Sequence, residues 1–337
     1  MSASGASAPL LEVRNLVVEF PGRRGTLRAL DGVSFDIAAG EILGVVGESG
    51  AGKSLTGAAI IGLLEPPGRI ASGEVRLGGQ RIDQLPHAQM RKIRGRRIGA
   101  IFQDPLTSLD PLATVGRQLI ETIRTHLPLD ARAAHARAVE LLRETGIPAP
   151  EARVDHYPHQ FSGGMRQRVV IALALAGKPE LIVADEPTTA LDVSIQAQVI
   201  ELLRRLCKDH GAAVMLITHD MGVIAEACDR VAVMYAGRVV EIGPVRSVIH
   251  APAHPYTAGL MASIPAIDRD RERLAQIDGA MPRLDAIAAG CPFHPRCPQA
   301  FDRCTTQRPE LLAASATRAA CWLVPASPER GAAGVVA

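Results

Sequence analysis

The chain has 337 residues, enough for one large domain with an appendage or for two modest domains. Hydrophobic residues make up 47% of the chain and aromatic residues only 3%, so the core must be built from Ala, Val, Leu and Ile. A formal net charge of +2 gives no case for nucleic acid or an anionic membrane as an electrostatic partner.

The start of the chain, residues 1–9, is rich in Ser and Ala and lacks the basic and apolar parts of a secretory signal. We therefore expect a disordered N-terminus. No apolar run reaches the roughly 18 to 20 residues that a bilayer crossing needs. Any membrane role is expected to come through a partner subunit.

The first predicted elements are two β-strands, at 10–20 and 29–37, joined by turn residues at 21–25. A continuous apolar run, ILGVV at 42–46, is typical of a strand buried on both faces of a parallel sheet. A helix is predicted over 55–64, beyond a glycine-rich stretch.

The middle of the chain predicts further strands and a long helical stretch. Strands are expected at 74–82 and 97–102, and helices over 114–145 with a break at Leu127 and Pro128. Beyond these, helices at 165–176, 193–209 and 221–227 alternate with strands at 181–184, 214–218, 231–235 and 238–242. The last two strands flank Ala236 and Gly237, which predicts a hairpin.

The alternation of strands and helices indicates an α/β fold with a mainly parallel core sheet, assigned to residues 10–243. An all-helical subdomain is expected within it, at about 104–160. Beyond Gly243 the composition shifts to Pro, His, Arg and Cys, so a C-terminal extension is placed at 244–325 and a flexible tail at 326–337.

A phosphate-binding loop is indicated directly after the strand at 42–46. Its pattern is G-x-x-x-x-G-K-[ST], with the residues Gly47, Glu48, Ser49, Gly50, Ala51, Gly52, Lys53 and Ser54. In such a loop the backbone N–H groups face the phosphates at the positive end of a helix. Lys53 would reach the β- and γ-phosphates of ATP, and Ser54 would ligate Mg²⁺. The alternative is a glycine-rich turn with a solvated lysine, which the flanking strand and helix disfavour.

Two carboxylates end the apolar strand at 181–184. Asp185 would hold Mg²⁺, and Glu186 would polarise the attacking water as general base. Taken alone, two acids at a strand end are often only a solvated loop. Beside a phosphate-binding loop, the catalytic interpretation is favoured.

A second anion site is indicated by Ser162, Gly163 and Gly164 at the start of the helix at 165–176, with Ser162 as N-cap. In isolation this sequence would be a plain loop. A single nucleotide does not need two phosphate-binding sites from the same chain. In a pair of chains, however, the second site of each chain could bind the phosphates of the ATP held by the other chain.

With these motifs in this order, the chain resembles the nucleotide-binding subunits of ABC transporters over roughly residues 10–242. The resemblance implies a P-loop NTPase cassette that also contains an antiparallel β subdomain. It further implies roles for Gln103 in sensing Mg²⁺ and coupling to membrane subunits, and for Asp192, with Ala190 and Leu191, in the D-loop. It implies that His219 contacts the γ-phosphate and that Phe20 stacks on adenine. For Phe20, a core position is the alternative.

Within this family the chain resembles the importers of oligopeptides, dipeptides, nickel or glutathione. The resemblance lies in Met165 of the FSGGM segment, in the stretch at 101–119 and in the segments 254–257 and 263–265. Peptide is the expected cargo, with nickel or glutathione as alternatives.

Four cysteines lie near the end of the chain, namely Cys291, Cys297, Cys304 and Cys321. Four thiols in a Pro-rich region suit a tetrahedral metal site or a cubane cluster, although the uneven spacing fits no zinc-finger formula. A [4Fe–4S] cluster is the hypothesis that the resemblance implies. Zinc, with His294 as a further ligand, and free thiols are the alternatives.

The resemblance also implies partners: a second ABC ATPase subunit (a related or identical chain), two transmembrane permease subunits and an extracytoplasmic substrate-binding protein. It implies a peripheral position on the cytoplasmic face of the plasma membrane. A soluble ABC ATPase of DNA repair or translation is the alternative class. The stretch between Ser54 and Ser162 is too short for the coiled coil of repair members, and translation-type members usually hold two cassettes. A regulatory, non-catalytic ATPase is disfavoured because the residues expected to bind and hydrolyse ATP are intact.

Overall fold

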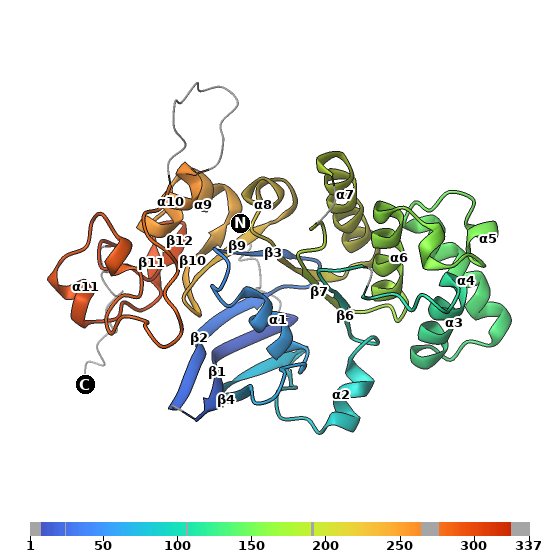
Figure 1. The fold of residues 1–337 in the computed structure, drawn as a ribbon, viewed down its shortest axis with the longest axis horizontal. Helices are drawn as coiled ribbons and strands as arrows, with labels where there is room; N and C mark the ends of the chain where they lie inside the picture. The colour runs from blue at the N-terminus through green and yellow to red at the C-terminus, as the bar shows by residue number, and fades with distance from the viewer. Residues whose placement is uncertain (1–7, 24, 106, 190–191, 264–275, 325–337) are drawn as a thin grey trace, which may run out of the picture.

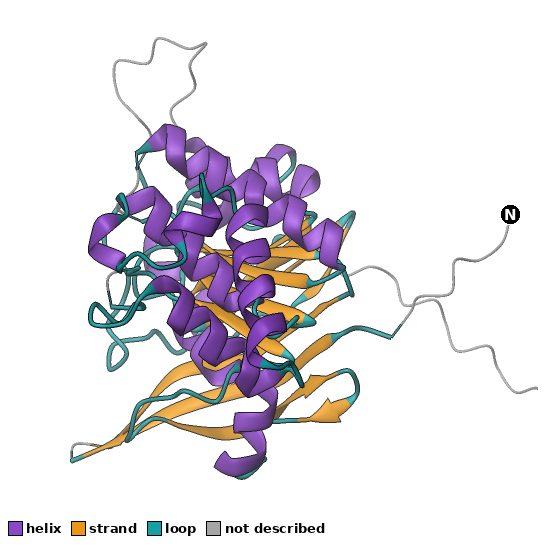
Figure 2. Ribbon diagram, turned by 90° about the vertical axis from the view of Figure 1, so that its right-hand side faces the viewer, coloured by secondary structure: helices purple, strands orange, loops and turns teal. Residues whose placement is uncertain are grey.

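The computed structural model describes residues 8–23, 25–105, 107–189, 192–263 and 276–324. The disorder predicted for 1–9 and the flexible tail predicted at 326–337 therefore fall largely or wholly outside the described residues. Two β-sheets and a set of helices make up the fold (Figures 1 and 2). The helical subdomain and the C-terminal region lie at opposite ends of the molecule (Figure 1).

The smaller sheet is antiparallel, with the strand order β2-β1-β4-β5. Its strands are β1 (Leu11–Gly22), β2 (Gly25–Ile37), β4 (Arg69–Leu77) and β5 (Gln80–Arg81). Alternate residues of β1, such as Leu11 and Val13, are buried against the core, as expected for strands with one solvated face. The expected antiparallel β subdomain is present.

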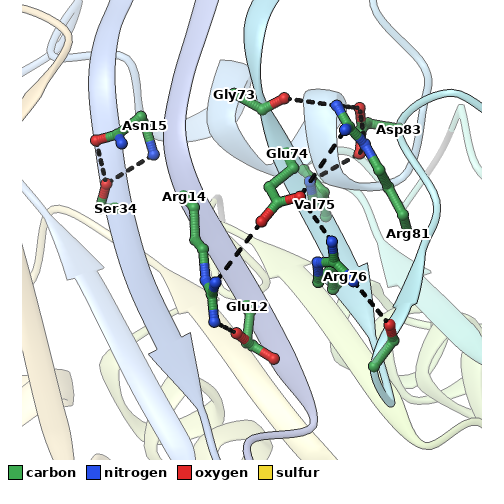
Figure 3. Close-up of polar contacts among 11 residues, drawn as sticks. Glu12, Arg14, Asn15, Ser34, Gly73, Glu74, Val75, Arg76, Arg81 and Asp83 are labelled. Atoms are coloured by element: carbon green, nitrogen blue, oxygen red, sulfur yellow. Dashed lines mark hydrogen bonds and ion pairs between the residues drawn. The ribbon is translucent and has the colours of Figure 1, made fainter.

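The solvated face of the smaller sheet carries a group of ion pairs (Figure 3). Glu74 of β4 lies 2.9 Å from a guanidinium nitrogen of Arg76 and 3.8 Å from those of Arg14 and Arg81. Opposite charges on neighbouring strands stabilise the pairing of those strands modestly, because these side chains are partly solvated.

The larger sheet has eight strands in the order β11-β12-β10-β9-β3-β8-β7-β6. They are β3 (Ile42–Val46), β6 (Ile98–Ile101), β7 (Leu181–Asp185), β8 (Ala213–Ile217), β9 (Arg230–Tyr235), β10 (Arg238–Pro244), β11 (Leu312–Ala314) and β12 (Thr317–Ala319). The run from β9 to β6 is parallel. Every residue of β3 and β8 is buried, which confirms the apolar run at 42–46 as a central strand.

Helices cover this sheet and form the subdomain at its β6 end. They are α1 (Lys53–Ile60), α2 (His87–Ile93), α3 (Val115–His126), α4 (Ala131–Glu144), α5 (Pro150–Arg153), α6 (Gly163–Leu175), α7 (Val193–His210), α8 (Met221–Ala227), α9 (Val245–His250), α10 (Pro255–Ala262) and α11 (Asp302–Thr306), with 3-10 turns η1 (Pro158–Gln160) and η2 (His294–Arg296). The side chains of Thr114 and Asp130 cap α3 and α4, so the helical stretch does break where Pro128 interrupts it.

Several predicted elements were wrong in their bounds; the strand expected at 29–37, for example, begins at Gly25. The helix expected at 55–64 is α1, which ends earlier because Gly62 takes a positive φ of 66° after the last turn. The single strand expected at 74–82 is two strands, β4 and β5, because Gly78 and Gly79 both take positive φ values and turn the chain back. The predicted hairpin at Ala236 and Gly237 is confirmed between β9 and β10.

The C-terminal region continues the larger sheet. The hairpin β11–β12 pairs with β10, with Glu241 opposite Ala319 and Ile242 opposite Arg318. The domain boundary near Gly243 therefore stays a prediction, since the sheet itself runs across it. Among the described residues, none of the helices combines the length and apolarity that a bilayer crossing requires.

Candidate active site

The glycine-rich loop joins β3 to α1 and needs glycine at two of its positions. Gly47 takes a φ of 153°, and a Cβ added there would lie 2.2 Å from the carbonyl oxygen of Met234. Gly52 takes a φ of 100°, and a Cβ there would lie 2.7 Å from Leu30. Only glycine allows the loop to curl this closely against β9 and β2, as an anion-binding loop requires.

Lys53 lies at the first position of α1 and is buried. Its ammonium donates to the carbonyl oxygens of Gly47 at 2.8 Å and Glu48 at 3.1 Å. Burial lowers the pKa of Lys53, although the nearby carboxylates of Glu186 and Asp185 oppose this effect. The loop thus holds a buried cation beside its own carbonyls, where water does little to screen the attraction of its charge for an anionic ligand.

Ser54 and Asp185 face each other across the site. The Ser54 hydroxyl donates to Asp185 Oδ1 at 3.0 Å, joining the first turn of α1 to the end of β7. Burial raises the pKa of Asp185, and the bond from Ser54 opposes that rise. A hydroxyl and a carboxylate are oxygen ligands of the kind that Mg²⁺ takes alongside phosphate oxygens, so this pair fits the expected ion.

Glu186 is held by three polar side chains. Gln103 donates through Nε2 at 3.0 Å, Thr189 through its hydroxyl at 2.9 Å, and His219 Nδ1 lies 3.2 Å away. Burial alone would raise the pKa of Glu186, but the bonds from His219 and Thr189 outweigh it and lower the pKa. Glu186 is therefore ionised at neutral pH.

The backbone of Glu186 is also unusual. Its φ is +46°, a left-handed conformation that is uncommon for a residue with a side chain. Its N–H donates to the carbonyl oxygen of Ile217 at 2.9 Å, which ties this conformation to β8. Strain of this kind is concentrated at functional sites, where the surrounding structure holds it in place.

Of these residues, Lys53, Ser54, Gln103, Glu186 and His219 line one cavity of about 750 Å³. Its lining residues are Phe20, Ala29, Ser49, Gly50, Ala51, Gly52, Lys53, Ser54, Leu55, Gln103, Glu186, His219 and Leu284. Gln103, Glu186 and His219 come from three separate segments, so the structure does bring these predicted residues together. Phe20 also reaches the cavity, while its ring packs against the backbone of Gly68. Leu284 of the C-terminal region was missed by sequence reasoning, since no motif includes it.

The predicted second anion site lies elsewhere. Ser162 caps α6, accepting from the Met165 N–H at 3.4 Å, and both Ser162 and Gly163 are exposed. Asp192 caps the neighbouring helix α7 and is also exposed, while Ala190 and Leu191 lie outside the described residues. Ser162, Gly163, Gly164 and Asp192 are not among the described residues that line the cavity at Lys53. Within one chain, therefore, the two predicted phosphate sites are separate.

The four C-terminal cysteines do not form the expected metal centre. In the described part of the chain, no group of three or more His, Cys, Asp or Glu residues is arranged to hold a metal ion. Burial raises the pKa of Cys291 to about 11, and the charges of Cys304, Cys321 and Cys297 add to that rise. The thiols are thus near one another. The described residues therefore show no [4Fe–4S] or zinc site, and His294 Nδ1 lies 2.9 Å from the carbonyl oxygen of Cys291.

Comparison with known protein families gave two matches. The family "ABC transporter" matches residues 30–189, and "Oligopeptide/dipeptide transporter, C-terminal region" matches residues 240–304. The first match contains the loop at Gly47, Gln103 and Glu186. The second contains most of the described C-terminal region.

Individual proteins are similar over most of their length. The dipeptide transport ATP-binding protein DppD of Escherichia coli (strain K12) is 46% identical over 302 residues, which cover 90% of this chain and 92% of that protein. The oligopeptide transport ATP-binding protein AppD of Bacillus subtilis (strain 168) is 47% identical over 304 residues, covering 90% and 93%.

Among solved structures, the ATP-binding cassette MJ0796 is similar in fold. Its dimeric post-hydrolysis form bound to ADP and Pi has a TM-score of 0.63 and 30% identity, covering 70% of this chain and 99% of that one. The match therefore includes nearly all of MJ0796 but leaves 30% of this chain without a counterpart.

Proposed function

The chain belongs to the family of ABC transporter ATP-binding subunits, and from this premise we propose that it hydrolyses ATP to energise a membrane importer of dipeptides or oligopeptides. The observation that carries the hydrolytic part is the hydrogen-bonded Glu186, which shares one cavity with Lys53 and Ser54. The names of its relatives support peptide as the cargo, in preference to nickel or glutathione.

The chain's own residues divide the work of hydrolysis. The loop from Gly47 to Gly52 and the ammonium of Lys53 bind the phosphates, and Phe20 with Leu284 offers apolar surface to the nucleoside. Ser54 and Asp185 would hold Mg²⁺, which would supply charge neutralisation at the phosphates. Glu186, ionised at neutral pH, orients a water molecule and accepts its proton as that water attacks the γ-phosphorus. The bond from the γ-phosphorus to the bridging oxygen breaks in the same step, and ADP leaves with that oxygen.

Gln103 and His219 have positions that suit them to sense the nucleotide. Both contact the Glu186 carboxylate, one from the segment after β6 and the other from the segment after β8. A γ-phosphate in the cavity would compete for the same groups. Movement of Gln103 would then be transmitted to the helical subdomain, which follows Gln103 in the chain.

A second ATPase subunit, identical or related, is part of this proposal. The exposed Ser162 and Gly163 at the start of α6 form an anion site that does not line the cavity of the same chain's phosphate loop. In a head-to-tail pair, this site and Asp192 of one subunit would close over the ATP of the other. Two permease subunits and an extracytoplasmic binding protein complete the proposed importer. The chain would then lie peripherally on the cytoplasmic face of the membrane.

For the C-terminal cysteines we propose separately a thiolate-bound [4Fe–4S] cluster. Its support is the nearness of the four thiols, whose charges contribute to the raised pKa of Cys291. Binding would require the thiols to lose their protons and move together. Iron and sulfide contents of anaerobically purified protein, compared with those of Cys304→Ser, would decide it. Iron-free protein from iron-replete cells would end this proposal.

Glu186→Gln tests the hydrolytic mechanism, because glutamine keeps the size of the side chain and removes the base. We expect ATP turnover to fall by about 10²- to 10⁴-fold while ATP binding persists. Glu180→Gln is the matched control, since Glu180 precedes β7 at its opposite end and pairs with Arg97. Unchanged turnover in Glu186→Gln would refute its role as the base. Co-purification of the chain with permease subunits, and turnover that rises with a peptide-loaded binding protein, would test the importer.

A further inference from the structure

The C-terminal region reaches the phosphate loop through one ion pair. Arg296 Nη1 lies 2.6 Å from Glu48 Oε2, and Arg296 Nη2 lies 2.9 Å from Glu48 Oε1. Each of the two terminal guanidinium nitrogens therefore bonds to its own carboxylate oxygen, the bidentate geometry that is strongest for such a pair. The Arg296 side chain is only 6% exposed, whereas that of Glu48 is 30% exposed, so water reaches the pair mainly from the Glu48 side.

Arg296 is fixed by further contacts on its own side. Its Nε donates to the carbonyl oxygen of Asp278 at 2.8 Å, and Nη2 lies 3.3 Å from those of Ile277 and Gly279. Its guanidinium also sits over the ring of Tyr235, 5.8 Å from the centroid. A guanidinium held from three directions cannot turn away from Glu48 without breaking other bonds.

Glu48 is held at its backbone as well. Its N–H donates to the hydroxyl of Tyr256 at 2.9 Å, and its carbonyl oxygen accepts from Lys53 at 3.1 Å. Tyr256 is fully buried on α10 and packs edge-on against Tyr235, 4.7 Å between ring centroids. One residue of the phosphate loop thus connects the C-terminal region directly to the phosphate-binding lysine.

The segment that Arg296 ties down also forms part of the cavity. Residues 277–279 accept its hydrogen bonds, and Met281 follows them near Gly50, where an added Cβ would lie 3.7 Å from Met281 Cγ. Leu284 then lines the cavity itself. One short stretch of chain, residues 277–284, therefore both bonds to Arg296 and lines the cavity.

We propose that Arg296 is a positioning residue for nucleotide binding, which together with Tyr256 holds the phosphate loop through Glu48 in its binding conformation. This inference rests on the proposed function as an ATPase. It makes the C-terminal region a structural part of the ATP site. We call the contacts of Arg296 and Tyr256 with Glu48 the clamp. Without the clamp, the loop would populate other conformations. The apparent affinity for ATP would then fall in proportion to the fraction of molecules whose loop is in the binding conformation.

The test compares Arg296→Ala with Arg308→Ala in the full-length protein. Arg308 is the matched control, because it also joins the C-terminal region to the cassette, by pairing with Asp31 of β2, but does not contact the phosphate loop. For Arg296→Ala we expect the Kd and KM for ATP to rise roughly tenfold, as for a competent fraction of about one tenth. The kcat should stay near that of the wild type, because saturating ATP restores the loop. Arg296→Lys keeps the positive charge but cannot form the two parallel hydrogen bonds to Glu48. Its Kd and KM for ATP should therefore lie between those of the wild type and those of Arg296→Ala.

A double-mutant cycle separates positioning from general support. If Arg296 acts through Glu48, Arg296→Ala should add little in a Glu48→Ala background. Should Arg296→Ala not fold, Glu48→Ala measures the same clamp from the loop side and must itself raise the KM. Wild-type ATP affinity in both variants, or an equal loss in Arg308→Ala, would overturn the inference. Failure of the wild type to bind ATP would instead refute the proposed function.

Discussion

His254 offers a sharp test of how the C-terminal region is built. It is the N-cap of α10, where its Nδ1 accepts the N–H of Tyr256 at 3.0 Å. The side chain is 1% exposed, and burial lowers its pKa from 6.5 to about 4. A neutral imidazole is required both for the cap, which needs an acceptor at Nδ1, and for the apolar surroundings.

The sign of the pH effect follows from this lowered pKa. Because the folded state binds the proton less readily than the unfolded one, stability is retained above about pH 6.5 and is lost as the pH falls toward 4. At about 1.4 kcal/mol for each pKa unit, the loss comes to roughly 3 kcal/mol. The Glu241 carboxylate accepts the backbone N–H of His254 at 3.0 Å, and its attraction for an imidazolium makes this figure an upper value.

His254→Asn isolates the contribution of the imidazole, since asparagine is a good N-cap and does not titrate. Trp322 is the only tryptophan of the chain and lies in the C-terminal region, so its fluorescence reports the unfolding of that region. In urea titrations from pH 7.5 to 4, the wild type should lose stability relative to the variant by up to roughly 3 kcal/mol. Parallel pH profiles for the two proteins would refute the reasoning.

Two further predictions concern packing. In Gly47→Ala the added Cβ would lie 2.2 Å from the Met234 carbonyl oxygen, so ATP binding should be lost. Gly40→Ala is the control, because Gly40 also has a positive φ, 71°, but lies in open space. This control should lose only about 1 to 2 kcal/mol of stability and should still bind ATP. Normal ATP affinity in Gly47→Ala, measured by titration, would contradict this. Burial raises the pKa of Cys207 to about 12 and also raises that of Cys228, so a thiol reagent at pH 8 should modify neither until the protein unfolds. Peptide mapping that finds Cys207 labelled in the native protein would show that this helix opens.

The central site could be predicted from sequence because its parts are local. The apolar run at 42–46 and the glycine pattern after it adjoin in the chain, so one strand, one loop and one helix follow from neighbouring residues. Glu186 lies at the end of a buried strand, and parallel strands place their ends together. Sequence alone could not show that Gln103 and His219 both bond to its carboxylate, although the family resemblance placed them at the site.

The clamp on the phosphate loop could not be predicted in this way. Arg296 and Glu48 are 248 positions apart, and neither belongs to a periodic pattern that would orient it. The pairing of β12 with β10 could not be predicted either. A three-residue strand such as β12 has too few alternating apolar and polar residues to be recognised as a strand. Glycines decided two of the errors in the bounds, since a positive φ at Gly62, or at Gly78 and Gly79, is a consequence of the whole fold.

The contacts of the C-terminal region form a single path that ends at the phosphate loop. Glu241 of β10 is fully buried and accepts from the backbone of Ala253 and His254 and from Thr317, which fixes the start of α10. Tyr256, two residues after His254, then bonds to Glu48. Protonation of His254 removes the acceptor that caps Tyr256, so ATP affinity should fall with pH in the wild type more steeply than in His254→Asn. An equal fall in both proteins would show that the cap and the phosphate loop are independent.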